Sequence, residues 1–169
     1  MPVSFINNAS IAAAAGISTS KLGAGAVLQV VNATKLGQLE TSFASATDLG
    51  LSASITPTSS SSKILVLVNA VGCCVRNNTT SNTWWHINLL RGSTSLIYFG
   101  DYIGINTSAS MGPTPTFPSC CYLDSPATTS STTYKIQGIR DSGTNNCIFN
   151  YQDSNFPAYS TMTLLEIAA

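Results

Sequence analysis

The sequence predicts an all-β protein, and three observations support this class. From Leu51 to Thr56 the residues LSASIT alternate between apolar and hydroxyl side chains, which is the period of a half-buried strand. A continuously apolar run, KILVLVNAV, follows from Lys63 to Val71. Short apolar segments then recur along the chain, separated by clusters of Gly, Asn, Pro and Ser. Many short strands with such turns are typical of a β sandwich.

The expected organisation is an N-terminal arm of residues 1–25 followed by one β-sandwich domain of residues 26–169. Within the arm, only Asn8–Gly16 has helical features, because Asn8 or Ser10 can cap a short alanine turn that Gly16 ends. The apolar residues expected to attach the arm to other proteins are Phe5, Ile6, Ile11 and Ile17.

The domain is expected to contain ten short strands. Pro57 cannot donate to a ladder, and the serines from Ser59 to Ser62 compete for backbone hydrogen bonds, so a tight turn is expected there with Lys63 at its rim. The longest segment without a clear strand is Gly100–Pro118, and long ordered loops often carry recognition. The expected strands are Ala26–Asn32, Leu39–Ala44, Leu51–Thr56, Lys63–Val75, Thr83–Arg91, Ser95–Phe99, Phe117–Leu123, Thr132–Arg140, Asn146–Gln152 and Ser160–Ile167.

Charge is scarce in this chain. Seven basic and seven acidic residues are spread over 169 positions, so the net charge is zero, and polarity is carried mainly by Ser and Thr. Nucleic-acid binding needs clustered Lys or Arg, which are absent here, so the composition argues against DNA or RNA as a partner. A nearly neutral surface also gives little colloidal repulsion, which favours an oligomer or a larger assembly.

The sequence predicts neither a membrane span nor an export signal. No segment approaches the roughly 20 continuous apolar residues that cross a bilayer. A secretory signal requires a basic segment at its start, but no basic residue precedes Lys21.

The five cysteines favour a structural role in a reducing compartment. Two adjacent pairs, Cys73–Cys74 and Cys120–Cys121, are followed by the single Cys147. Neighbours on a strand point to opposite faces, so each pair is expected to place one thiol in the core and one outside. Buried small hydrophobic residues are the preferred interpretation, and a bridge between the two pairs is the alternative. The spacing does not match a zinc site, so no metal is expected.

Assembly is also suggested by the last strand, Ser160–Ile167. Met162 and Leu164 would point to one face, and Leu165 and Ile167 to the other, so both faces carry apolar side chains. Either this strand is central between two layers, or one face lies against copies of the chain. The candidate oligomer contacts are Leu164, Leu165 and Ile167.

Catalysis is not expected, although several residue types could support it. His86 follows two tryptophans, and paired carboxylates could cleave a glycosidic bond. On the Thr83–Arg91 strand, however, Trp85, Ile87 and Leu89 share one face, which makes His86 an ordinary half-exposed residue. The aspartates lie beside Gly, Ser or Asn, where they usually form side-chain turns; they are Asp101, Asp124, Asp141 and Asp153. No nucleophile, metalloprotease or phosphate-loop motif occurs.

Glycan binding is the stronger alternative, because aromatic rings near strand ends can stack on sugars. The rings considered are Trp84, Tyr98, Tyr102 and Tyr159. The competing interpretation is that such rings pack over the sandwich edge or a subunit interface. The candidate receptor-binding residues are Asp101, Tyr102, Asn106 and Trp84.

Several phrases of the chain resemble the C-terminal β domain of tailed-phage fibre and related virion proteins, of the kind found in marine and freshwater phages, including cyanophages. They are DLGLSASITPTSSSSKILVLVNAVG, INLLRGSTSLI, YLDSPATTSSTTYKIQ and STMTLLEIAA. The resemblance covers about residues 26–169. It implies a jelly-roll-like sandwich on the virion exterior, assembled in the host cytoplasm, commonly homotrimeric, non-enzymatic and without a cofactor.

The chain departs from long fibres, because no repeats, heptads or glycine-triplet shaft precede the domain. A short tail fibre or fibre tip that contacts the host surface is therefore expected. Its expected partners are further copies of the chain, other virion proteins that the arm contacts, and a host surface glycan. The alternative is a head decoration protein that braces the capsid. A nonviral adhesin or lectin would need a secretion route.

Overall fold

The computed structural model describes residues 22–76, 81–104, 113–152 and 157–169. These residues form strands and no helix, which confirms the all-β prediction for the described chain. The expected helical turn at 8–16 and the arm residues Phe5, Ile6, Ile11 and Ile17 lie outside the described residues, as do Asn106 and Asp153. The strands are β1 (Val27–Lys35), β2 (Leu39–Thr41), β3 (Thr47–Ile55), β4 (Lys63–Asn69), β5 (Cys74–Val75), β6 (Trp84–Arg91), β7 (Thr94–Ile103), β8 (Ser119–Asp124), β9 (Thr132–Ser142), β10 (Cys147–Phe149) and β11 (Ser160–Ile167).

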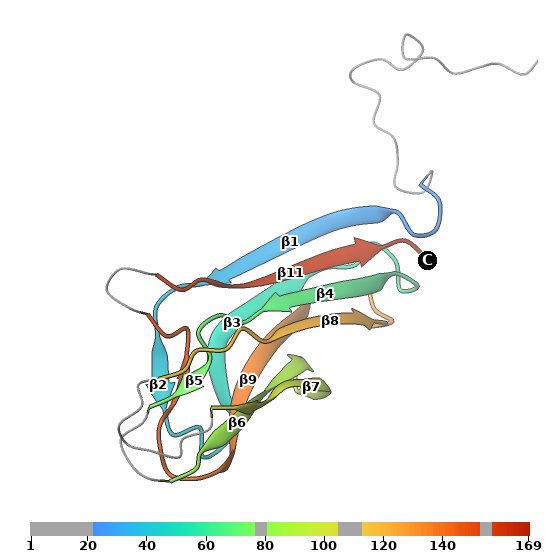
Figure 1. Ribbon diagram of the computed structural model, residues 1–169. Helices are drawn as coiled ribbons and strands as arrows, with labels where there is room; N and C mark the ends of the chain where they lie inside the picture. Colours follow the sequence, from blue (N-terminus) through green and yellow to red (C-terminus); the bar gives the residue numbers. More distant parts are fainter. Residues whose placement is uncertain (1–21, 77–80, 105–112, 153–156) are drawn as a thin grey trace, which may run out of the picture.

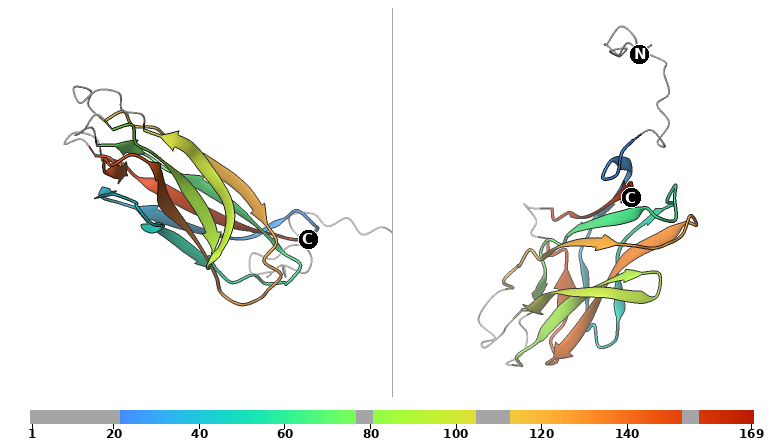
Figure 2. Two further views of the ribbon diagram at one scale, coloured as in Figure 1. Left: turned by 90° about the horizontal axis from the view of Figure 1, so that it is seen from below. Right: turned by 90° about the vertical axis from the view of Figure 1, so that its right-hand side faces the viewer.

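Two four-stranded antiparallel sheets pack face to face in a sandwich-like arrangement (Figure 1). One has the order β1-β11-β4-β8 and is called the β11 sheet below; the other, β3-β9-β6-β7, is called the β9 sheet. A small third sheet, β2-β10-β5, lies at one end of the sandwich. The two views of Figure 2 show the layers from below and along their length.

The core forms where the inner faces of the sheets meet. On β3 the side chains of Leu51, Ala53 and Ile55 are buried while the intervening residues are exposed, as the alternating sequence predicts. On β6 the side chains of Trp85 and Ile87 are fully buried. These residues belong to one continuous hydrophobic cluster with members from all three sheets, so the described chain has a single core.

The start and the end of the described chain lie at one end of the sandwich, and the small third sheet lies at the other. At one end, Ile167 of β11 pairs with Val27 and with Lys63, and the backbone N–H of Gly25 donates to the carbonyl of Ala168 at 2.8 Å. Both the start and the end of the described chain therefore lie there, and we call it the terminal end (Figure 1). The opposite end, which carries the small sheet, is called the distal end.

An ion pair fixes β6 relative to these ends. Arg91, the last residue of β6, donates to both oxygens of Asp124 at 2.9 and 2.8 Å, and the hydroxyl of Tyr134 donates to the same carboxylate at 2.6 Å. Asp124 ends β8 opposite Ile64, so this cluster belongs to the terminal end. The other end of β6, which begins at Trp84, therefore lies at the distal end.

The segment Thr56–Ser62 connects the two sheets, because β3 lies in the β9 sheet and β4 in the β11 sheet. Two expectations about the elements are corrected. The expected strand Lys63–Val75 is divided into β4 and β5, since Gly72 has φ of 64° and a Cβ there would lie 2.7 Å from the backbone nitrogen of Tyr151. The expected loop at Gly100–Pro118 begins later, because β7 continues to Ile103.

The cysteine expectation holds for one adjacent pair and fails for the other. All five thiols are free, and Cys120 is partly buried while Cys121 is exposed. Cys73 and Cys74, however, are both fully buried, because β5 pairs with β10 in the small sheet and covers the sandwich end. Burial raises the pKa of Cys74 and of Cys147 to about 12, so these buried thiols are neutral at physiological pH.

The last strand, β11, is central in its sheet and has two different faces. Its residues alternate between buried and half-buried, and Met162 and Leu164 are fully buried. Leu164 therefore belongs to the core and not to a surface that a second copy could contact, which corrects its assignment as an oligomer candidate. Leu165 and Ile167 lie on the outer face.

Candidate functional site

Side chains of three neighbouring strands meet on the outer face of the β9 sheet at the distal end. On β6 the alternation that buries Trp85 and Ile87 turns Trp84 and His86 outward, and β9 and β7 pair with β6 on either side. The residues that line two adjoining hollows here are Trp84, His86, Tyr98, Asp101, Tyr102, Ile139 and Asp141. We call this group the aromatic pocket.

A bulge in β7 brings two consecutive residues to the pocket. Ile103 pairs with Trp85 and Phe99 with Ile87, so His86 alone faces Gly100, Asp101 and Tyr102. In a regular strand Asp101 and Tyr102 would point to opposite faces, but both are exposed, and Tyr102 has a left-handed backbone with φ of 58°. Bulges often re-aim side chains in this way next to functional sites.

Gly100 makes the bulge possible. It has φ of 66°, and a Cβ at this position would lie 2.8 Å from the Cβ of Pro118. Any other residue would therefore be strained in its backbone and would collide with the ring of Pro118.

His86 is the central polar group of the aromatic pocket. Its Nδ1 lies 2.7 Å from Oδ2 of Asp141; because an ionised carboxylate can only accept, Nδ1 carries the proton. The other ring nitrogen, Nε2, is buried and has no hydrogen-bond partner among the described residues. Buried polar atoms are rarely left unpaired, so Nε2 is an unsatisfied polar atom of a residue that lines the pocket.

Aromatic rings flank the histidine on both sides. Tyr98 lies edge-on to the His86 ring with centroids 4.8 Å apart, and the rings of Trp84 and Tyr102 are 6.0 Å apart with a tilt of 42°. Tyr102 is 68% exposed, so its ring face is accessible. The two hollows have volumes of about 390 and 280 Å³ and share His86 and Asp101, which is room for one or two small rings.

The charge of the pocket is acidic. Among the described residues that line the two hollows, Asp101 and Asp141 are the carboxylates, and none is Lys or Arg. Aromatic faces with convergent carboxylates and a histidine suit hydroxyl-rich neutral rings or a cationic group, because hydroxyls donate to carboxylates and cations are attracted to ring faces. An anionic ligand would be repelled.

The rest of this outer face is polar and internally bonded. Gln137 and Lys135 of β9 donate to Asp48 of β3 at 2.7 and 3.1 Å, and the hydroxyls of Ser54 and Thr133 lie 2.7 Å apart. Burial raises the pKa of Asp48, but the hydrogen bonds from Gln137 and Lys135 outweigh burial, so its pKa is lowered overall.

Three of the four receptor candidates are brought together by the structure. Trp84, Asp101 and Tyr102 all line the aromatic pocket, whereas Asn106 lies outside the described residues. Asp124 is buried in the ion pair at the terminal end, far from the pocket, and Tyr159 lines neither hollow. Sequence reasoning missed the pairing of His86 with Asp141, because it depends on the register between β6 and β9; both residues lie at outward positions of their strands, but no local pattern pairs the strands.

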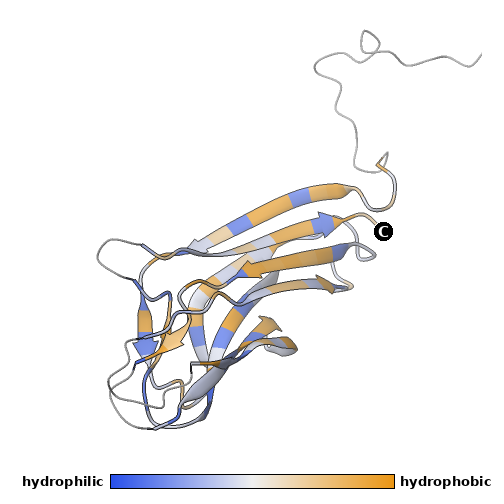
Figure 3. Cartoon of the chain, viewed as in Figure 1, coloured by the Kyte–Doolittle hydropathy of each residue, from blue (hydrophilic) through white to orange (hydrophobic). Residues whose placement is uncertain are grey.

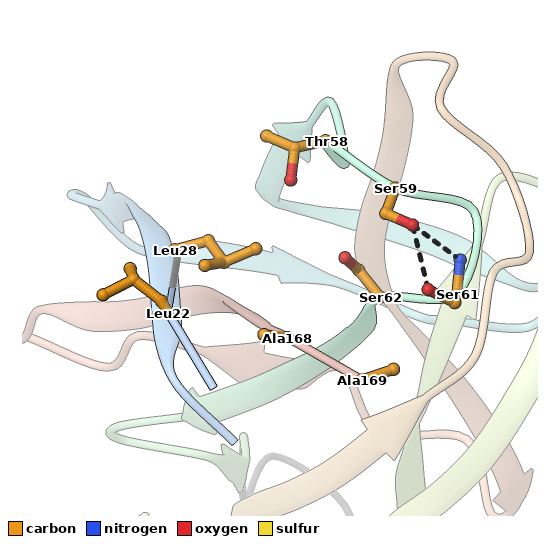
Figure 4. Close-up of a pocket in the computed structure, with 8 residues that line it drawn as sticks. All are labelled: Leu22, Leu28, Thr58, Ser59, Ser61, Ser62, Ala168 and Ala169. Atoms are coloured by element: carbon orange, nitrogen blue, oxygen red, sulfur yellow. Dashed lines mark hydrogen bonds between the residues drawn. The ribbon is translucent and has the colours of Figure 1, made fainter. Parts of the chain in front are cut away.

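Another crevice lies at the terminal end (Figure 4). It has a volume of about 320 Å³ and is lined by Leu22 and Leu28, by serines of the β3–β4 turn, and by Ala168 and Ala169. The first described residue and the last residue thus line the same crevice.

Two other kinds of site are not found among the described residues. No group of three or more His, Cys, Asp or Glu side chains there could hold a metal ion. The described part of the chain also contains no helix with the length and apolar character needed to cross a bilayer. Comparison with known proteins adds no family: no family model matches this chain, and no curated protein matches it.

Proposed function

We propose that this chain is a non-enzymatic structural protein of a bacteriophage virion, a short tail fibre or fibre tip on the virion exterior that contacts the host surface. The observation that carries the contact role is the aromatic pocket at the distal end, opposite the end at which the described chain begins and finishes. In such a design residues 1–25 attach the domain to other virion proteins, and the pocket faces outward. No cofactor takes part.

The proposed domain is a jelly roll. The strand orders β1-β11-β4-β8 and β3-β9-β6-β7 support this, because two four-stranded sheets with Greek-key connections define that fold. Apart from the β6–β7 hairpin, the connections between these eight strands pass from one sheet to the other.

The proposed ligand is a neutral or amino-bearing glycan of the host surface. Trp84, Tyr98 and Tyr102 offer ring faces for stacking, while Asp101 and Asp141 accept hydroxyl or amino protons. Anionic sugars are disfavoured by the two carboxylates. A homotrimer would present three pockets, and several weak contacts then combine into high avidity without further interactions.

Binding to purified host surface polysaccharide tests the contact role. Trp84→Ala and Tyr102→Ala should each weaken binding about tenfold, since an aromatic anchor at a binding site contributes more than about 1 kcal/mol. Tyr159→Ala is the matched control, because this ring is 49% exposed but lies outside the pocket, and its binding should not change. Equal loss in all three variants would refute the pocket as the contact.

The competing function is a head decoration protein that braces the capsid, and the resemblance of the sequence to virion domains fits both. Antibody-gold labelling of intact particles separates them. Label at the tail end supports the fibre, label over the whole head supports decoration, and no label on any particle refutes the virion assignment.

A further inference from the structure

The outer face of the β11 sheet carries an apolar row that crosses all four strands. Val30 of β1 pairs with Leu165 of β11, Leu165 pairs with Leu65 of β4, and Leu65 pairs with Leu123 of β8. All four side chains point away from the core. We call these residues the apolar row.

The neighbouring row is mixed, because it contains Asn32, Thr163, Leu67 and Cys121. Leu67 pairs with Thr163 on one side and with Cys121 on the other. In the single chain Val30 is 58% exposed, Leu123 is 52% exposed and Leu67 is 38% exposed. Figure 3 shows β4 coloured as hydrophobic along most of its length. Scattered exposed leucines are ordinary, but a contiguous apolar band marks an interaction surface.

Charge is nearly absent from this face. Among its outward positions only Lys63, at the rim, is charged; the others are apolar, hydroxyl, amide or thiol side chains. In a symmetric contact a residue at the symmetry axis lies near its own copy, so a charge there would meet a like charge. An uncharged face avoids that repulsion and offers no charge for a different partner to recognise.

The size of the face is sufficient for a stable contact between copies. Four strands of six to nine residues, spaced about 4.8 Å apart with about 3.3 Å per residue, cover roughly 480 Å². Two such faces bury about 1,000 Å², which is the approximate lower limit for a specific interface. If three such faces surround a three-fold axis, each sheet lies about 5 to 6 Å from the axis. This distance is close to half the spacing of roughly 10 Å between two packed sheets.

We infer that a second copy of this chain covers the apolar row, so that the β11 sheets of neighbouring copies pack against one another. The number of copies in this inference is taken from the homotrimer proposed above. The inference does not depend on what the aromatic pocket binds. It leaves the pocket free, because the pocket lies on the other sheet and at the distal end.

The test is the mass of the full-length protein by size-exclusion chromatography with light scattering. Wild type should have the mass of a trimer. Leu67→Glu and Leu123→Glu should weaken association roughly a hundredfold, because each places a charge in the desolvated contact. Ile97→Glu is the matched control, since Ile97 is 37% exposed but lies on β7 of the other sheet, and its mass should not change.

Wild-type labelling keeps the inference testable if the charged variants fail to fold. Cys121 is exposed in the single chain and lies beside Leu67, so a maleimide should label it slowly in the assembly and quickly after dilution to monomers. An oligomer that both Glu variants leave intact overturns the inference. A monomeric wild type overturns it as well, and a monomer with a protected Cys121 would show that the chain covers its own face.

The failures of the two proposals are distinguishable. A monomeric Leu67→Glu variant should still bind a soluble host oligosaccharide with unchanged Kd, while losing avidity for the polysaccharide. Unchanged mass in the Glu variants with intact glycan binding would refute only the interface. An intact trimer without glycan binding would refute only the contact role.

Discussion

The two outer faces of the sandwich share one architecture but carry opposite chemistry. On the β9 sheet the outward residues are joined by hydrogen bonds such as Gln137 to Asp48, and they surround a hollowed aromatic site. On the β11 sheet the outward residues form a nearly uncharged apolar band. Because both sheets bury their other face in the same core, this difference is not required for folding. This difference is the basis of the two proposals above, a glycan ligand on the β9 sheet and a second copy of the chain on the β11 sheet.

The largest expected difference in stability is between alanine variants of the two adjacent tryptophans on β6. Trp85 is fully buried, packs edge-on against Phe43 at 5.0 Å and donates to the carbonyl of Cys74. Trp85→Ala should therefore lower the free energy of unfolding by about 3 to 5 kcal/mol, measured by urea denaturation. Trp84→Ala should cost less than about 1 kcal/mol. Similar losses for both would show that Trp84 is a core residue and not part of a ligand site.

The same comparison on the other sheet uses two adjacent leucines of β11. Leu164 is fully buried, so Leu164→Ala should destabilise each chain by about 2 to 5 kcal/mol. Leu165→Ala should leave the stability of the monomer within about 1 kcal/mol of wild type but shift the assembly toward monomers in light scattering. If Leu165→Ala changed neither property, the apolar row would have no partner.

Acid should weaken the β11 sheet through Glu166. Burial raises the pKa of this carboxyl, but hydrogen bonds from Gln29 and Thr58 outweigh burial and lower it below the ordinary 4.5. The resulting stabilisation is present above pH 4.5 and is lost as the pH falls through the lower pKa of the folded state. Glu166→Gln should cost about 1 to 2 kcal/mol at pH 7 and flatten the acid limb of the stability curve. An unchanged limb would show that other carboxylates dominate.

Alkaline pH should act through the buried thiols at the distal end. Burial raises the pKa of Cys74 and Cys147 from 9.0 to about 12, so both thiols are protonated in the folded state when they ionise in the unfolded chain. Stability is complete below pH 9 and falls as the pH rises toward 12. Urea titrations at pH 7 and 10 should show a smaller fall for Cys147→Ala than for wild type. For protein diluted to monomers, Cys121→Ala is the control and should behave as wild type, because Cys121 is exposed in the single chain.

The smallest effect is expected on the polar face. Ser54→Ala removes the 2.7 Å contact with Thr133, but water can replace an exposed hydroxyl, so stability should change by less than about 0.5 kcal/mol. Thermal unfolding would detect a larger loss, and such a loss would mean that this hydroxyl pair contributes to the sheet more than an exposed contact usually does.

Strand positions were largely predictable, whereas strand partners were not. The alternation from Leu51 to Thr56 reports which side chains are buried, because burial follows a local period of two. The sequence around Gly72 resembled a continuing strand, since the backbone of Tyr151 that excludes a Cβ there comes from a distant segment. The pair Cys73–Cys74 was mispredicted for the same reason, because β10 reaches β5 only in the folded chain.

The sequence by itself determined the all-β class, most strand positions, the scarcity of charge and the aromatic candidates Trp84 and Tyr102, because these depend on composition and local period. The tertiary structure decided that His86 meets Asp141, that Leu164 faces the core while Leu165 faces outward, and that the pocket lies opposite the end where the described chain begins and finishes. These features depend on which strands pair and in what register. Register is set by the packing of the whole core, and no single segment of the sequence encodes it.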